Sequence, residues 1–153
     1  QIEFLKDKGY IQTRQPDFSS SRGNIYLIEP LKGNESTEHS FMVELIAEEL
    51  REYTKEIEIR GTRKVDIEFA LNSGEKVAFE IETGKELEKH KERALIKSQR
   101  LDQEYDKWFF IVTNKKMKKH YGKYAETLTR VNVREKIDAL FDGKKIAKVG
   151  DFA

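Results

Sequence analysis

Two short stretches decide the fold: Val65-Asp66-Ile67-Glu68-Phe69-Ala70-Leu71 and Val77-Ala78-Phe79-Glu80-Ile81-Glu82. Each alternates apolar and polar side chains, which is the pattern of a β-strand with one buried face. Asn72-Ser73-Gly74 lies between them, and the Gly is placed for the left-handed conformation that a tight turn requires. The two stretches therefore predict an antiparallel β-hairpin.

The apolar pattern also sets the register of this hairpin, because a slip by one residue would move one strand's apolar set to the wrong face. The register that keeps the apolar side chains together has a three-residue loop at 72–74. It places Asp66 directly opposite Glu80, and Glu82 lies one pleat further along the same face. Its apolar pairs are Val65 with Ile81, Ile67 with Phe79 and Phe69 with Val77.

Asp66 and Glu80 carry like charges, and directly opposed carboxylates repel each other. A cation between them would relieve this repulsion. Mg²⁺ or Mn²⁺ is the expected ion, because hard oxygen ligands suit both. The alternative is a solvated acidic face on an amphipathic hairpin, and the hairpin alone does not distinguish the two.

The composition describes one domain of ordinary size without a dominant charge. The chain has 153 residues, and its 29 Lys and Arg nearly cancel its 28 Asp and Glu. A nucleic-acid surface would therefore need local segregation of charge. The absence of Cys excludes disulfides, thiolate metal sites and a cysteine nucleophile. Since no apolar run approaches the roughly 20 residues of a membrane span, and no signal peptide is visible, we expect no membrane partner and a cytoplasmic location. High Lys and Glu content without Cys is compatible with a thermophilic source.

The chain divides into two expected parts, residues 1–33 and residues 34–153. Because it begins with Gln inside a helix pattern, we expect it to be part of a longer protein. The main part reads α-β-β-β-α-β-α-β, which predicts a mixed α/β sheet with helices on its faces. The expected helices cover 38–53, 85–105 and 115–124, with a short terminal helix that ends at Gly143, and the expected strands cover 57–60, 65–71, 77–82, 108–112 and 128–133.

The order of these elements and their acidic residues resemble the PD-(D/E)xK, or restriction-endonuclease-like, nuclease superfamily over residues 36–133. Glu44 corresponds to the inward acid of the first helix, Asp66 to the strand Asp and Glu80 to the acid of the (D/E)xK strand. The resemblance implies that Asp66 and Glu80 bind Mg²⁺ or Mn²⁺ directly. It also implies that the carbonyl of Ile81 joins the metal shell, and that Glu44 binds through water or holds a second ion.

The activity implied by the resemblance is metal-assisted hydrolysis of DNA phosphodiester bonds. The Lys that usually stabilises the developing charge is replaced here by Glu82, which cannot supply positive charge. Three consequences stay open. Lys85 or Lys89 on the following helix reaches the site, Glu82 helps to bind a second metal ion, or the site only binds and does not catalyse. Lys85 is the substitute that we expect.

A narrower resemblance rests on Phe79-Glu80-Ile81-Glu82-Thr83-Gly84 together with His39. The combination is similar to nuclease-like domains attached to winged helices in plasmid replication-relaxation proteins and related mobile-element proteins, where an acidic residue also replaces the Lys. Residues 4–28 look like the end of such a winged helix, and Arg14 and Arg22 would then contact DNA phosphates. The alternative is a plain hairpin that packs on the main domain. His39 would contact metal or phosphate, or serve only as a helix-capping or surface residue.

A basic segment follows the strand expected at 108–112. Its lysines alternate with Tyr121 and Tyr124, and they can neutralise backbone phosphates or simply form a solvated face. The residues expected to contact DNA are Lys115, Lys116, Lys119 and Lys123.

Two functions compete with that of a nuclease. One is a catalytically inactive nuclease-fold module that binds DNA or assembles a replication or transfer protein of a plasmid or virus. The other is a metal-bound structural domain that docks onto a replication or conjugation ATPase. Many nucleases of the resembled superfamily act as dimers, so a homodimer is compatible with the expected nuclease.

Overall fold

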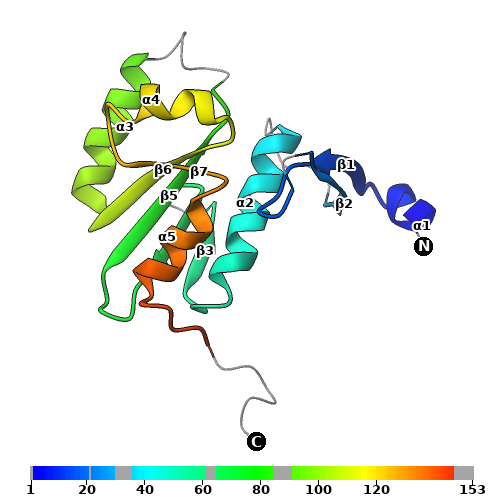
Figure 1. Ribbon diagram of the computed structural model, residues 1–153, viewed down its shortest axis with the longest axis horizontal. Helices are drawn as coiled ribbons and strands as arrows, with labels where there is room; N and C mark the ends of the chain where they lie inside the picture. Colours follow the sequence, from blue (N-terminus) through cyan, green and yellow to red (C-terminus); the bar gives the residue numbers. More distant parts are fainter. Residues whose placement is uncertain (1, 21, 30–35, 61–64, 85–90, 147–153) are drawn as a thin grey trace, which may run out of the picture.

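The computed structural model describes residues 2–20, 22–29, 36–60, 65–84 and 91–146. A short N-terminal arm precedes an α/β domain (Figure 1). None of the helices in these ranges is long and apolar enough to cross a membrane.

The domain is built on a mixed sheet of five strands in the order β3-β4-β5-β6-β7. β3, β4 and β5 are antiparallel neighbours, whereas β6 runs parallel to β5 and β7 runs parallel to β6. The expected mixed α/β sheet with flanking helices is confirmed. The strands are β3 (Ile57–Ile59), β4 (Ile67–Ala70), β5 (Lys76–Glu82), β6 (Lys107–Val112) and β7 (Thr127–Thr129).

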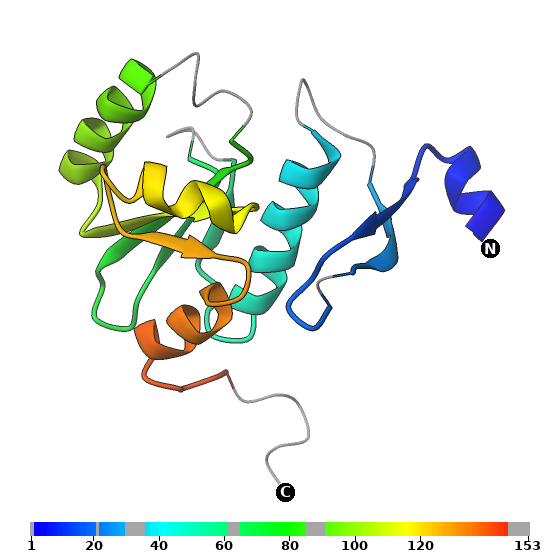
Figure 2. The ribbon, with the colours of Figure 1, turned by 45° about the horizontal axis from the view of Figure 1, so that its top comes forward.

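Helices cover both faces of this sheet (Figures 1 and 2). α2 and α5 pack on one face, and α3 and α4 pack on the other. The helices are α2 (Thr37–Leu50), α3 (Lys91–Glu104), the 3₁₀ turn η1 (Lys115–Met117), α4 (Lys118–Tyr121) and α5 (Val133–Leu140).

The hairpin of β4 and β5 forms in the predicted register. Ile67 pairs with Phe79, and Phe69 pairs with Val77. The backbone N–H of Leu71 donates to the carbonyl of Glu75 at 2.9 Å, which closes a three-residue loop, and Gly74 in that loop has a φ of 89°. The alternating pattern and the turn chemistry were therefore sufficient to predict the pairing.

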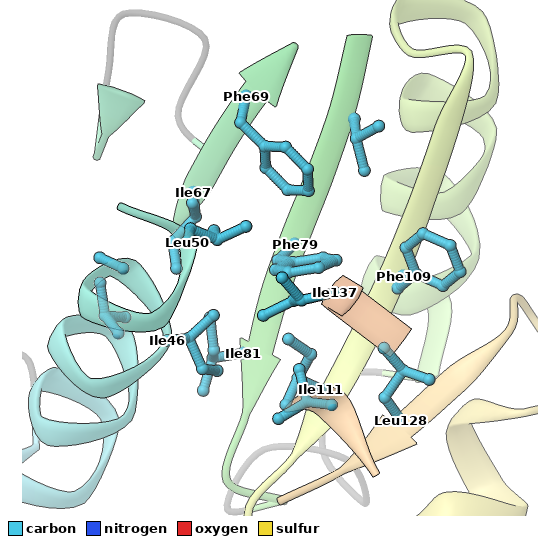
Figure 3. Packing of buried hydrophobic residues seen from close by; sticks show 14 of the residues in the cluster. Ile46, Leu50, Ile67, Phe69, Phe79, Ile81, Phe109, Ile111, Leu128 and Ile137 are labelled. Carbon is cyan, nitrogen blue, oxygen red and sulfur yellow. The ribbon is translucent and has the colours of Figure 1, made fainter. Parts of the chain in front are cut away.

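Side chains along β5 alternate between two apolar clusters, one on each face of the sheet. Phe79 and Ile81 join the apolar cluster under α2 and α5 (Figure 3), while Ala78 lies in the second cluster, under α3 and α4. Val65 was expected to share the face of Ile67 but lies in the second cluster, so this expectation is wrong. The reason is that the chain bends at Asp66, before β4 begins at Ile67, and the strand alternation does not continue across the bend.

The arm consists of α1 (Ile2–Asp7) and an antiparallel hairpin of β1 (Ile11–Gln15) and β2 (Asn24–Ile28). Figure 2 shows this hairpin beside α2, where the ring of Tyr26 lies 4.7 Å from that of Phe41. The hairpin therefore packs on the main domain, and a role as a DNA-binding wing stays a prediction.

The loop of the hairpin is also tied to the main domain. Asp17 is buried and accepts hydrogen bonds from Ser19, Asn24 and Tyr26, while its carbonyl accepts one from Arg130. The guanidinium of Arg134 lies over the ring of Phe18 at 5.7 Å. Arg130 follows β7 and Arg134 lies in the first turn of α5, so both connect the arm to a distant part of the sequence.

Two predicted elements end elsewhere than expected. The strand expected to reach 133 ends at Thr129, because Asn132 Oδ1 accepts a hydrogen bond from the backbone N–H of Thr129 at 2.7 Å and turns the chain into α5. Val133 is accordingly a buried residue of α5, and Val131 is exposed. The basic helix expected over 115–124 is divided into η1 and α4 and ends at Tyr121.

Candidate active site

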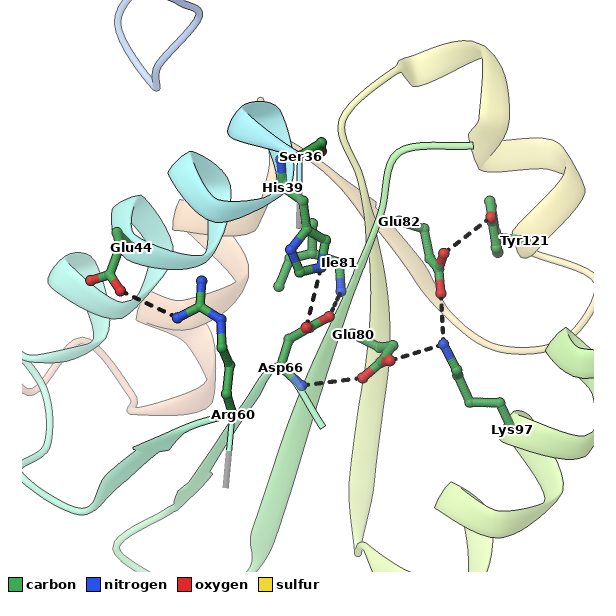
Figure 4. A network of polar contacts seen from close by, with 10 residues as sticks. All are labelled: Ser36, His39, Glu44, Arg60, Asp66, Glu80, Ile81, Glu82, Lys97 and Tyr121. Atoms are coloured by element: carbon green, nitrogen blue, oxygen red, sulfur yellow. Dashed lines mark hydrogen bonds and ion pairs between the residues drawn. The ribbon is translucent and has the colours of Figure 1, made fainter. Parts of the chain in front are cut away.

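A cluster of polar side chains lies where β5 ends, between the first turn of α2 and the middle of α3 (Figure 4). β5 supplies Glu80 and Glu82, and the bend before β4 supplies Asp66. β5 is the strand at which the sheet changes from antiparallel to parallel pairing. The acidic residues of the cluster therefore come from β5 and from the bend just before β4.

Asp66 and Glu80 are held together by reciprocal hydrogen bonds with the backbone. The N–H of Asp66 donates to Glu80 Oε2 at 3.3 Å, and the N–H of Ile81 donates to Asp66 Oδ2 at 2.8 Å. The predicted proximity of these two carboxylates is confirmed. Each carboxylate is therefore oriented by a backbone N–H of the segment opposite.

Lys97 of α3 places its positive charge beside two carboxylates of β5. Its Nζ lies 2.9 Å from Glu80 Oε1 and 3.1 Å from Glu82 Oε1. Burial by itself lowers the pKa of Lys97, but the charges of Glu80 and Glu82 outweigh burial, and the resulting pKa is higher than usual. Lys97 is therefore a positively charged ammonium at neutral pH.

The surroundings of Glu80 raise the pKa of its carboxyl group. Burial and the nearby charge of Asp66 raise the pKa of Glu80 to about 7, although Lys97 acts in the opposite direction. A carboxyl group of this kind takes up a proton near neutral pH, where ordinary glutamates are ionised. Lys97 therefore offsets only part of the combined effect of burial and of the Asp66 charge on Glu80.

Two further side chains fix the outer oxygens of the acidic residues. His39 Nε2 lies 3.2 Å from Asp66 Oδ1, and the hydroxyl of Tyr121 donates to Glu82 Oε2 at 3.3 Å. His39 is held in the first turn of α2 because the side chain of Ser36 caps this helix and accepts from the N–H of His39 at 3.1 Å. The acidic residues are thus held by α2, α3 and α4 together.

Glu44 does not join this cluster. Its side chain is 54% exposed, and its Oε1 lies 3.6 Å from Arg60 Nη1 (Figure 4), so the expectation that it points inward is wrong. The buried stripe of α2 includes Val43 and Ala47, and Glu44 is rotated from this stripe towards solvent.

Lys97 was not among the predicted site residues, although its spacing carried a signal. It is one helical turn before Leu101, which is fully buried, and it is next to Ser98, which is also buried. The same helical geometry places Leu95 on the outer side of α3, where it is 47% exposed. Lys85 and Lys89, the substitutes that were expected, lie outside the residues that the structure describes.

The donor set of the cluster fits a magnesium-like ion in part. Within the described ranges, no group of three or more His, Cys, Asp or Glu side chains is placed to hold a metal ion. Mg²⁺, however, is commonly bound through one or two carboxylates together with water and substrate phosphates. Asp66 and Glu80 are two such carboxylates, and the raised pKa of Glu80 indicates that an added cation would be stabilised beside it.

The residues expected to contact DNA lie at the surface on separate elements. Arg14 on β1 is exposed and donates from Nη1 to the carbonyl of Gly23 at 3.0 Å, and Arg22 is exposed in the hairpin loop. The expected lysines are all exposed, on η1, on α4 and just after it, close to Tyr121 of the cluster: Lys115, Lys116, Lys119 and Lys123.

The chain was compared with protein-family models, with curated proteins and with solved structures, and none of the three comparisons found a match.

Proposed function

We propose that the main domain is a restriction-endonuclease-like nuclease that hydrolyses phosphodiester bonds in DNA with the help of Mg²⁺ or Mn²⁺. The observation that carries the proposal is the position of Lys97. Its ammonium contacts Glu80 and Glu82, and Glu80 in turn is hydrogen-bonded to the backbone of Asp66. The reaction requires two carboxylates that can hold the ion, here Asp66 and Glu80, and an ammonium group beside them, here that of Lys97.

In this proposal Asp66 and Glu80 hold the divalent ion, and the carbonyl of Ile81 is a third candidate oxygen. When bound, the ion would polarise the phosphoryl group and lower the pKa of an attacking water. Asp66 is suited to this role because the N–H of Ile81 and the ring of His39 hold both of its oxygens in fixed directions. Glu44 has no direct part, because its side chain turns away from the cluster.

Lys97 takes the role of the Lys that is missing from the strand. Its charge is available to stabilise the negative charge that develops on the phosphoryl oxygens in the transition state. Glu82, which stands where the Lys is usual, would then be a positioning residue. It contacts Lys97 Nζ at 3.1 Å and is itself held by Tyr121.

The second candidate function is a catalytically inactive module of the same shape that binds DNA or assembles with a partner such as a replication ATPase. The observation that favours it is the double pairing of Lys97, because an ammonium held by two carboxylates can be a purely structural ion pair. The two candidates differ in whether Lys97 contributes to turnover.

The test is cleavage of a panel of labelled single-stranded, duplex and branched DNA substrates with Mg²⁺ or Mn²⁺. We expect the unmodified chain to cleave, Asp66→Asn to be inactive, and Lys97→Met to lose about 10²-fold or more in kcat. Lys76→Met is the matched control, because Lys76 is exposed at the opposite end of β5, and it should cleave normally. Absence of cleavage by the unmodified chain across the panel would support the inactive module instead.

A further inference from the structure

Five lysines form an exposed surface that neither the core nor the acidic cluster uses. We call it the lysine face, and it consists of Lys115, Lys116, Lys118, Lys119 and Lys123. It follows β6 directly and includes η1, α4 and the first residues after α4.

The lysines point outward because the other side of this segment is apolar. Met117, Tyr121 and Tyr124 pack against the second apolar cluster, and the ring of Tyr121 lies 5.0 Å from that of Phe110. These three are spaced by four and three residues. Lys116, Lys119 and Lys123 are spaced by three and four residues, so they follow the opposite side of the same helical segment.

The charge of the lysine face is not balanced by neighbouring acids. Residues 113–125 contain no Asp or Glu. Elsewhere Lys107, Lys136 and Lys145 each pair with a glutamate, but none of the five lysines forms an ion pair with any residue in the part of the chain that the structure describes. Five positive charges are therefore concentrated on one short segment of a chain whose net charge is +1.

The lysine face adjoins the acidic cluster. Tyr121 donates to Glu82 Oε2, and the backbone N–H of Thr113, two residues before Lys115, donates to the carbonyl of Glu82 at 3.1 Å. Met117 is in close contact with Gly84, because a Cβ placed there would lie 2.8 Å from the sulfur of Met117. The segment that carries the lysines is thus anchored to the end of β5 at three points.

We propose that the lysine face binds the phosphate backbone of DNA and holds it beside the acidic cluster. The identity of the polymer rests on the proposed function. η1 and α4 together are about 12 Å long, which corresponds to about three phosphate steps along one strand. Lysines act on phosphates as point charges and read no base edges, so this binding is independent of sequence.

The experiment measures binding of the full chain to a labelled duplex of about 20 base pairs by fluorescence anisotropy, in EDTA, between 50 and 200 mM NaCl. The test variant is K116Q/K119Q. The matched control is K55Q/K76Q, which removes the same charge from two exposed lysines at the opposite end of the sheet, where Glu56 and Glu58 lie nearby. Thermal unfolding of both variants confirms that they are folded.

We expect the slope of log K against log salt to decrease in magnitude by about 2 in K116Q/K119Q and to be unchanged in K55Q/K76Q. Over this fourfold range of salt, the unmodified chain should then lose about tenfold more affinity than K116Q/K119Q does. Equal slopes for the two variants would overturn the proposal. Lysine-dependent binding to anionic lipid vesicles without binding to DNA would overturn it as well.

The use of EDTA separates this proposal from the nuclease function. DNA binding that depends on Lys116 and Lys119, without cleavage when Mg²⁺ is added, would support the lysine face and contradict the nuclease. If cleavage does occur, K116Q/K119Q should raise KM and leave kcat unchanged, whereas a fall in kcat with KM unchanged would contradict a role in backbone binding.

Discussion

Replacing Glu80 by Gln should make the fold more stable above neutral pH and remove one of the two proposed metal ligands. Glu80 is only 6% exposed, and its pKa rises from 4.5 to about 7 because of burial and the charge of Asp66. In the unfolded chain the same carboxyl group titrates near its ordinary value. The folded protein therefore holds a proton on Glu80 at pH values at which the unfolded chain has released it.

This difference gives the sign and the size of the effect. Between about pH 4.5 and pH 7 the folded state binds more protons than the unfolded state, so the free energy of unfolding falls as the pH rises. A pKa that rises from 4.5 to about 7 corresponds to about 3 kcal/mol, at roughly 1.4 kcal/mol for each tenfold change in proton affinity. Gln removes this term because it is neutral, like the protonated carboxyl group, and the contact with Lys97 is already one of the causes of this pKa. The net gain at pH 8 is about 3 kcal/mol.

The assay is urea unfolding of the unmodified chain and of Glu80→Gln at several pH values from 5 to 8.5. The difference between their free energies of unfolding at each pH isolates the contribution of Glu80 from that of other titrating groups. We expect the variant to be relatively more stable as the pH rises, with the change complete by about pH 8. Glu58→Gln, which alters an exposed carboxylate on β3, is the control and should run parallel to the unmodified chain. If the stability of Glu80→Gln also ran parallel to that of the unmodified chain over this pH range, the raised pKa of Glu80 would be refuted.

Three further predictions follow from the same structure. Mg²⁺ at ten times its dissociation constant should raise the free energy of unfolding of the unmodified chain by about 1.4 kcal/mol, and an equal effect on Asp66→Asn in thermal melts would contradict the proposed ligand. Phe79→Ala should cost about 3–5 kcal/mol in urea unfolding, because Phe79 is fully buried and contacts the rings of Phe69 and Phe109, and a cost below 1 kcal/mol would mean that the site collapses. Tyr26→Phe should cost about 1–3 kcal/mol at pH 7, because it removes a hydrogen bond that holds the pKa of Asp17 below its usual range. This cost should shrink as the pH falls below about 4, where the unfolded chain takes up the proton, and a cost that does not vary with pH would contradict the pairing.

Several features of the fold could be predicted because they depend on neighbours in the sequence. The alternation of side chains and a three-residue loop with Gly74 were enough to place Ile67 opposite Phe79 and to bring Asp66 beside Glu80. The strand expected at 108–112 is confirmed as β6, which is buried and runs parallel to β5. These inferences hold because the strand period and the turn geometry act over a few residues.

Other expectations failed where a local pattern was extended past a bend or around a helix. Val65 changed faces because the backbone bends at Asp66. Glu44, which the resemblance placed inward, lies outside the buried stripe of α2 and is turned towards solvent. Such errors arise because the sequence shows which residues are apolar, but it does not show how far a neighbouring helix or strand covers each side chain.

The amino-acid sequence by itself determined that Asp66 and Glu80 meet, and it left open whether a cation or solvent offsets their charges. It did not determine which cation the chain provides. Lys97 lies 15 residues from Glu82, on a helix that packs across the sheet, and only that packing brings its Nζ within 3.1 Å of Glu82 Oε1 and 2.9 Å of Glu80 Oε1. The physical reason is that hairpin pairing is a local property, whereas the approach of α3 to β5 depends on the whole buried face between them.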